Sequence, residues 1–257
     1  STHSKIIQGS GLGTSSILAA SVLKILYRLS NHTYSSSENE YPGLYDQSIL
    51  LEQSFGLNSG WQDARGASGG TSAIKDFYAP ATESLPTPER KFIRNIDESC
   101  FVDRVVLFDT GIARSATRGL NEVLDVYLTR DTIRYLGISA SLEIHDKMVD
   151  ALQLGDYTEL GILATKYWGF RCLLDPGATN KVLQYLFESP EIRALSDGGL
   201  LTGAGGGGFA LIIARSGCSI QLREVLNSLK KRSEYSNSGV VSYGLNSTGI
   251  KLTETSK

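Results

Sequence analysis

The chain has 257 residues, of which 41% are hydrophobic and 20% charged, as in an ordinary globular protein of one or two domains. The formal net charge of −2 gives no electrostatic reason to expect binding to nucleic acid or to a membrane surface. The three cysteines form no CxxC pair, and no apolar run reaches the roughly 18 residues that span a bilayer. We therefore expect a cytoplasmic protein without a membrane or nucleic-acid partner.

The first part of the chain predicts helices separated by turn-rich segments. An apolar helix is expected to begin near Thr14 and a second one to cover Leu44–Phe55, with a polar loop over residues 30–43 between them. The stretch TSAIKDFY, residues 71–78, alternates loosely and predicts a strand. Residues 79–90 hold three of the six prolines and are typical of a connection between domains.

The second part predicts strands and helices in a mixed order. Strands are expected over residues 103–111 (DRVVLFDTG) and 239–246, and a strand, a glycine loop and a strand over residues 198–215. Helices are expected across residues 115–174, with breaks near Gly137 and Gly155, and over residues 178–189 and 220–232. This order favours an α+β domain with helices on one face of a mainly antiparallel sheet.

The stretch GSGLGTSSILAA, residues 9–20, places three glycines and the hydroxyl triplet Thr14, Ser15 and Ser16 at the start of the first predicted helix. A glycine loop lets a ligand approach the backbone, and a helix N-terminus offers unpaired N–H groups, so the stretch predicts a phosphate site. Neither GxxxxGK[ST] nor GxGxxG fits the spacing. The alternative is a purely structural glycine turn capped by Thr or Ser.

Two further signals point to the same chemistry. Glu52 and Asp63 are a carboxylate pair, of which one could hold Mg²⁺ and the other accept a proton from a hydroxyl. The run TGAGGGGF, residues 202–209, would weaken a sheet and allows close approach of a ligand. Each signal also has an ordinary explanation: surface acids in the first case, a bulge or turn in the second.

Together these motifs resemble the GHMP kinases, a superfamily that includes galactokinase, homoserine kinase and mevalonate kinase. Within it, the chain is most similar to the fucokinases, including the kinase part of bifunctional fucokinase/GDP-fucose pyrophosphorylases. The segments that carry this resemblance are GSGLGTSSILAA, LEQ, GWQD, LFDTG, YLTRD, LDPGATN and LTGAGGGGFALIIA. The resemblance implies a two-domain α+β GHMP kinase fold: a partial N-terminal domain over residues 1–98 and a ferredoxin-like C-terminal domain over residues 99–257.

The resemblance also implies residue roles. Asp63 matches the catalytic carboxylate, and Ser15 and Glu52 match the ligands of Mg²⁺. The residues that match the ATP loop are Gly9, Ser10, Gly11, Leu12, Gly13, Thr14, Ser15 and Ser16. Those that match substrate-binding positions are Trp61, Gly203, Gly205, Gly206 and Gly207. The implied reaction is phosphoryl transfer from ATP to the anomeric hydroxyl of L-fucose.

Two departures from the fucokinase pattern bear on activity. Ala64 stands where a glutamine is expected, and the family's first motif is absent, since only eight residues precede Gly9. We therefore expect the chain to be part of a longer protein, fused in that protein to a nucleotidyltransferase domain. Two alternatives stay open. One is a heptose-phosphate kinase of the same superfamily, with Arg65, Arg114 and Arg118 as candidate phosphate ligands; the other is a non-catalytic binding remnant.

Overall fold

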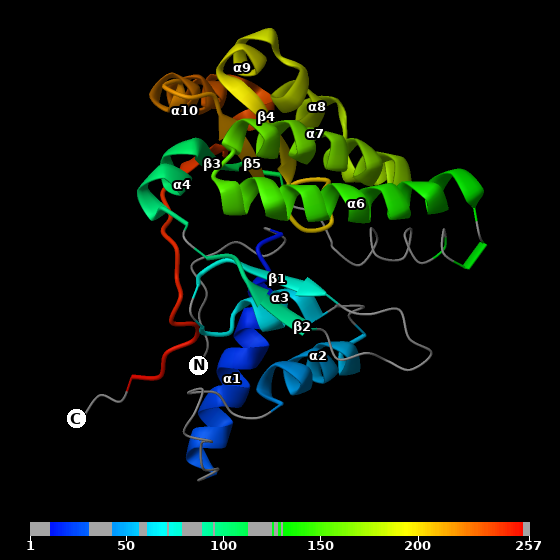
Figure 1. The fold of residues 1–257 in the computed structure, drawn as a ribbon, viewed down its shortest axis with the longest axis vertical. Helices are drawn as coiled ribbons and strands as arrows, with labels where there is room; N and C mark the ends of the chain where they lie inside the picture. Colours follow the sequence, from blue (N-terminus) through cyan, green and yellow to red (C-terminus); the bar gives the residue numbers. More distant parts are fainter. Residues whose placement is uncertain are drawn as a thin grey trace. The chain divides into compact units, whose positions relative to one another are not determined.

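A computed structural model of the chain describes residues 11–30, 43–56, 61–70, 72–78, 89–94, 96–112, 125, 128–129 and 131–253 (Figure 1). The chain divides into two compact units, and each unit consists of two separate segments of the chain. The helical unit comprises residues 13–94 and 245–257, and the sheet unit comprises residues 1–12 and 95–244. The predicted domain limits at residues 98 and 99 stay a prediction. In the described residues, no helix combines the length and apolar character that a membrane span requires.

In its described residues, the helical unit contains three helices and a two-stranded antiparallel sheet. Its elements are α1 (Thr14–Leu29), α2 (Leu44–Ser54), α3 (Trp61–Gly66), β1 (Lys75–Tyr78) and β2 (Glu89–Phe92). Both predicted helices and the predicted strand are confirmed. The short helix α3 was not predicted, because glycines flank it on both sides. Buried side chains of the three helices form one cluster, made of Ala20, Leu44, Tyr45 and Ala64.

The sheet unit has a four-stranded antiparallel sheet in the order β4-β5-β3-β6. Its strands are β3 (Val105–Asp109), β4 (Ser196–Leu201), β5 (Phe209–Ala214) and β6 (Gly239–Val241). The α-helices among its described residues are α4 (Glu98–Arg104), α6 (Thr132–Leu154), α7 (Tyr157–Leu174), α8 (Lys181–Glu188), α9 (Pro190–Leu195) and α10 (Ser219–Ser228). Short 3₁₀ turns lie at η1 (Pro176–Ala178), η2 (Leu229–Lys231) and η3 (Ser233–Tyr235). The strand order is that of the expected ferredoxin-like domain.

Helices cover both faces of this sheet, so the expectation of helices on one face is wrong. Alternate residues of a strand point to opposite faces. Phe108 of β3 packs in a cluster with side chains of α8, α9 and α10. Val105 of the same strand, with Ile213 of β5, packs instead against α6 and α7. The strands β3 and β5 are buried on both faces, and their nearly continuous apolar sequences reflect that.

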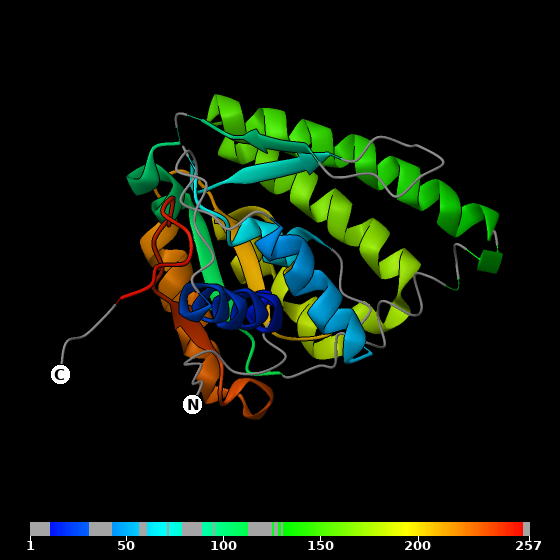
Figure 2. The same ribbon diagram turned by 90° about the horizontal axis from the view of Figure 1, so that it is seen from below.

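Helices α6 and α7 form an antiparallel pair that runs side by side in two views (Figure 1, Figure 2). The predicted break at Gly155 is confirmed, because Gly155 takes a left-handed conformation that ends α6. The predicted break at Gly137 is wrong, because α6 continues through it. A glycine inside a helix costs only about 1 kcal/mol, which the packing of α6 on α7 outweighs.

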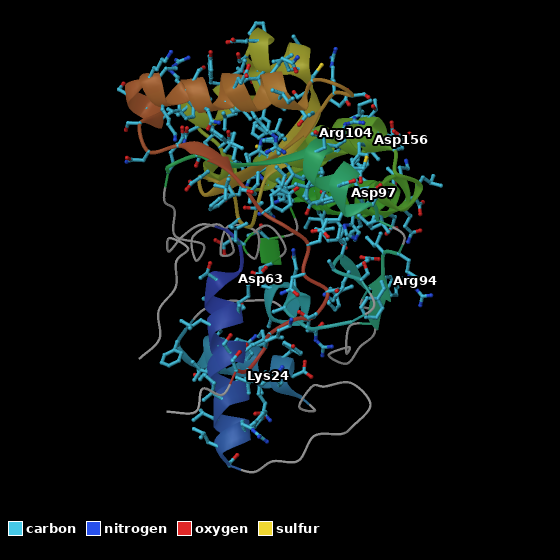
Figure 3. All side chains as sticks on the ribbon, turned by 90° about the vertical axis from the view of Figure 1, so that its left-hand side faces the viewer. Lys24, Asp63, Arg94, Asp97, Arg104 and Asp156 are labelled. Atoms are coloured by element: carbon cyan, nitrogen blue, oxygen red, sulfur yellow. The ribbon has the colours of Figure 1, made fainter. Side chains whose placement is uncertain are left out.

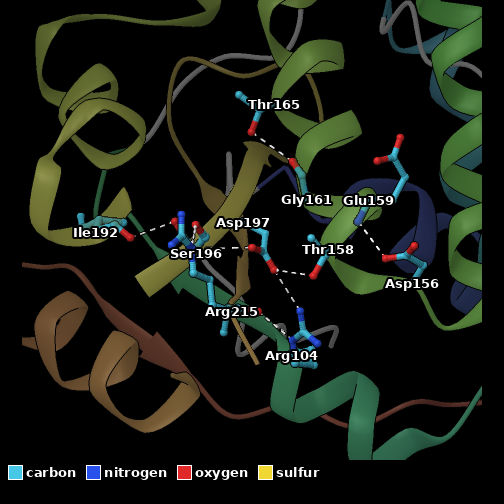
Figure 4. A network of polar contacts seen from close by, with 11 residues as sticks. Arg104, Asp156, Thr158, Glu159, Gly161, Thr165, Ile192, Ser196, Asp197 and Arg215 are labelled. Carbon is cyan, nitrogen blue, oxygen red and sulfur yellow. Dashed lines mark hydrogen bonds and ion pairs between the residues drawn. The ribbon is translucent and has the colours of Figure 1, made fainter. Parts of the chain in front are cut away.

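A charged network ties four elements of the sheet unit together (Figure 4). Asp197 of β4 accepts hydrogen bonds from Nη2 of Arg104 at 3.0 Å and from Oγ1 of Thr158 at 3.1 Å. Arg104 also donates from Nε to the Ala214 carbonyl at 2.7 Å. The side chains of Arg104 and Asp197 are 13% and 12% exposed, so their ion pair is largely shielded from water.

Replacing Asp197 with Ala should lower the free energy of unfolding by about 3–5 kcal/mol, because a largely buried arginine would lose its counter-charge. Urea unfolding measures this change. Asp197→Asn keeps an acceptor oxygen for Thr158 and should cost less. Equal losses in the two variants would assign the whole effect to the carboxylate charge, whereas unchanged stability in Asp197→Asn would show that the charge contributes nothing.

Candidate active site

The start of α1 has the geometry of an anion site. Gly13, the residue before the helix, has a φ of 63°, and Thr14, Ser15 and Ser16 make the first turn. The first N–H groups of a helix lack intrahelical acceptors and carry partial positive charge. The Ser15 side chain is exposed, whereas Ser16 is buried. Gly9 and Ser10, also predicted for this loop, lie outside the described residues.

Glu52 is a buried acid held beside this turn. Its side chain is 3% exposed, and its Oε2 accepts a hydrogen bond from Oγ of Ser16 at 2.5 Å. Ser48, one turn earlier on α2, donates to the Ser16 carbonyl at 3.2 Å. Oε1 of Glu52 is buried without a hydrogen-bond donor in the part of the chain that the structure describes. A buried carboxylate oxygen without a donor is costly, and a bound cation would compensate it.

Asp63 lies against the same turn from α3. The Cβ that alanine would add at Gly13 falls 2.8 Å from Cγ of Asp63, so only a hydrogen leaves room there. Partial burial raises the pKa of Asp63, and the nearby charge of Glu52 raises it further. Residues 13, 16, 52 and 63 therefore meet within the helical unit, although 50 positions separate the first from the last.

Replacing Gly13 with Ala should reduce both stability and any turnover that uses Asp63. Alanine pays about 1–2 kcal/mol in the left-handed region, and its methyl group would displace the Asp63 carboxylate. A displacement of about 1 Å at a reacting group costs roughly 10²-fold in rate.

Gly56→Ala is the matched control, because Gly56 has a φ of 76° and open space around the added carbon. It should show the stability loss alone, measured by urea unfolding. If Gly13→Ala had the same turnover as this control, the action of Asp63 would not depend on its close contact with Gly13.

Two neighbours of Asp63 on α3, Ala64 and Arg65, are engaged within the helical unit. Ala64 is completely buried in the cluster that joins the three helices, so the glutamine expected there would not fit without repacking. Arg65 pairs with Asp46 of α2 and is thus engaged within the helical unit. Trp61 begins α3, but its side chain lies outside the described ones.

The glycine run between β4 and β5 lies in the sheet unit and contacts the beginning of the loop. A Cβ at Gly11 would fall 2.9 Å from the Thr202 carbonyl oxygen, and one at Gly203 would fall 2.9 Å from Cα of Gly11. The N–H of Gly206 donates to the Ala178 carbonyl in η1. Gly205 and Gly207 share the positive φ of this run. The contact with Thr202 was not predicted, because 191 positions separate it from Gly11.

The chemistry that the helical unit can support follows from these contacts. Among the described residues, no group of three or more His, Cys, Asp or Glu side chains could hold a metal ion. A cation at Glu52 would therefore take its remaining ligands from hydroxyl and phosphate oxygens, as Mg²⁺ does in phosphoryl-transfer sites. The residues fit such an ion, since Glu52 offers a free oxygen and Ser15 an exposed hydroxyl.

Comparison with solved structures shows which fold this is. Galactokinase of Lactococcus lactis in complex with galactose matches 96% of this chain and 69% of its own, with a TM-score of 0.67 and 19% identity. Mevalonate kinase of L. major in complex with R-mevalonate matches 91% of this chain and 67% of its own, with a TM-score of 0.63 and 17% identity. The chain thus has the fold of the GHMP kinases. No family model matches the chain.

Comparison with curated sequences shows which proteins with this kind of fold the chain resembles in sequence. The bifunctional fucokinase/GDP-fucose pyrophosphorylase of Arabidopsis thaliana is 32% identical over 91% of this chain and 21% of its own length. The L-fucokinase/L-fucose-1-P guanylyltransferase of Bacteroides fragilis is 28% identical over 85% of this chain and 22% of its own. The chain is therefore a GHMP kinase relative that is related to L-fucokinase. It spans about a fifth of the length of these curated relatives.

Proposed function

We propose that the chain forms the kinase part of a fucokinase, which transfers the γ-phosphoryl group of ATP to the anomeric hydroxyl of L-fucose. The observation that carries this proposal is the meeting of a free Glu52 oxygen and the Asp63 carboxylate at the N-terminus of α1. The relationship to L-fucokinase over 91% of the chain supports the choice of sugar.

The proposed loop, Gly9 to Ser16, binds the phosphates through backbone N–H groups and the partial charge of the helix. Asp63 accepts or orients the proton of the attacking hydroxyl. Because a sugar hydroxyl is weakly acidic, positioning of the hydroxyl by Asp63 contributes more than the basicity of the carboxylate. Trp61, Gly203, Gly205, Gly206 and Gly207 stay proposed substrate-binding residues.

Ser15 and Glu52 are the proposed ligands of Mg²⁺, which when bound neutralises charge on the phosphates. Ser16 donates to Oε2 of Glu52, which leaves the other carboxylate oxygen available as a ligand that would bind the ion. Asp63 stays outside this ligand set in the proposal, because its task is to face the hydroxyl of the sugar.

A test of the proposal incubates the purified protein with ATP, Mg²⁺ and one sugar at a time: L-fucose, D-galactose or a heptose phosphate. Phosphorus NMR then identifies the product, and a sugar 1-phosphate formed from L-fucose is the expected result. Turnover of the heptose phosphate alone would favour the alternative kinase. The pairing of Arg65 with Asp46 does not favour that alternative.

Nucleotide binding without any transfer would favour the non-catalytic alternative. The same assay on the longer natural protein, if one exists, tests whether further domains are needed for turnover. Fusion to a nucleotidyltransferase domain, which the names of both relatives suggest, stays a proposal, as does the cytoplasmic location.

A further inference from the structure

The end of the described chain packs as a strap on the helical unit. After the sheet unit ends at Gly244, residues 245–257 are grouped with α1, α2 and α3. We call residues 246–250 the strap. An Asx turn fixes its shape, because Oδ1 of Asn246 accepts hydrogen bonds from both N and Oγ1 of Thr248 at 2.8 Å.

The strap touches the segment that follows α3. The N–H of Gly70 donates to the Ser247 carbonyl at 2.9 Å. A Cβ at Gly249 would fall 2.4 Å from N of Gly69, and one at Gly69 would fall 3.0 Å from the Thr248 carbonyl oxygen. Two backbones therefore lie in direct contact here, only a few residues after Asp63.

A buried lysine anchors the other end of the strap. Lys24 lies on the buried face of α1 with Ser16 and Ala20, at intervals of four residues, and is 6% exposed. Its Nζ donates to the Ile250 carbonyl at 2.6 Å. The Ile250 side chain packs against the cluster that contains Ala64, the neighbour of Asp63. Figure 3 shows Lys24 and Asp63 at different levels along α1.

A buried ammonium group is costly unless it is hydrogen-bonded, so a lysine at this position needs a reason. Methionine or leucine would fill the same space without that cost. The hydrogen bond of Lys24 supplies the reason: the ammonium group donates to a backbone carbonyl of a segment that is 226 positions away in the sequence.

We propose that Lys24 is a positioning residue: it anchors the strap, and the strap clamps residues 67–70 so that α3 holds Asp63 against Gly13. This inference rests on the proposed function for the role of Asp63. The clamp itself, however, is a structural claim that can be tested without any turnover.

The test measures hydrogen exchange over residues 61–70 and, separately, kcat and KM, in Lys24→Met and Gly249→Ala. The first variant removes the anchor, and the second forces the strap away from Gly69 without touching Lys24. We expect exchange over residues 61–70 to rise by about tenfold or more in both variants. We also expect kcat to fall by about tenfold or more while KM for ATP stays the same.

Matched controls separate the clamp from general loss of charge or backbone strain. Lys251→Met removes an exposed charge one residue from Ile250, and Gly217→Ala places alanine at a φ of 75° in open space. Neither should change exchange over residues 61–70. Lys24→Arg keeps a donor and should restore part of the protection.

Unchanged exchange over residues 61–70 in both Lys24→Met and Gly249→Ala would overturn the clamp. Increased exchange with unchanged kcat would overturn the positioning role of Lys24. If the unaltered protein phosphorylates no sugar, the proposed function fails, and the exchange measurement alone still decides the clamp. If Lys24→Met does not fold, hydrogen exchange over residues 61–70 and kcat are compared in Gly249→Ala and Lys24→Arg instead.

Discussion

Asp63→Asn should lower kcat by about 10²–10⁴-fold, the contribution typical of a positioned general base. Asparagine has nearly the same shape and leaves Gly13 its room, but its amide cannot accept the proton of a sugar hydroxyl. Initial rates with saturating ATP, Mg²⁺ and L-fucose measure the effect. The KM for ATP should stay close to its original value, since Asp63 is not proposed to bind the nucleotide.

The free energy of unfolding of Asp63→Asn should not fall, although its turnover does. Burial and the charge of Glu52 raise the pKa of Asp63, so the ionised carboxylate is less favourable in the folded than in the unfolded chain. A neutral asparagine removes that penalty, so urea unfolding without ligands should show an unchanged or higher free energy of unfolding. Gains of this kind are typical of residues kept for function.

Asp146→Asn is the control for charge removal, because Asp146 is an exposed acid on α6. It should change neither kcat nor stability. Unaltered turnover in Asp63→Asn would remove Asp63 from the mechanism, whereas a loss of turnover together with a large loss of stability would point to a structural role.

Glu52→Gln should raise the Mg²⁺ concentration needed for half-maximal activity by roughly tenfold or more, because the ion loses a charged ligand. Glutamine keeps the length of the side chain and an oxygen that can accept the Ser16 hydrogen bond. The variant therefore tests the charge at the free oxygen rather than the packing of α2 on α1. Titration of the initial rate with Mg²⁺ measures the shift.

Calorimetry of Mg²⁺–nucleotide binding supplies a readout that does not require turnover. The affinity should fall in Glu52→Gln and stay constant in Glu143→Gln, which removes an exposed charge from α6. An unchanged magnesium requirement in Glu52→Gln would mean that another group in the protein holds the ion.

Local patterns were enough to predict most of the elements. The helical spacing of apolar residues after Thr14 predicts α1, and the β-branched and aromatic run at Val105–Asp109 predicts β3. Both patterns are local, so these two elements could be found from the sequence. The helix α3 was missed because it is only six residues long and contacts within the unit stabilise it. Helices on the second face of the sheet were missed because the apolar runs of β3 and β5 indicate that both faces are buried but not which elements cover them.

The sequence by itself determined the chemistry that is available: a glycine-hydroxyl turn at a helix start, two acids and a second glycine run. Only the tertiary structure decided which of these groups meet. It placed Ser16 on Glu52 and Asp63 against Gly13, and it brought Lys24 to the carbonyl of Ile250. The physical reason is that hydrogen bonds and close approaches between residues 36 to 226 positions apart depend on how the helices and the strap pack, which no local pattern encodes.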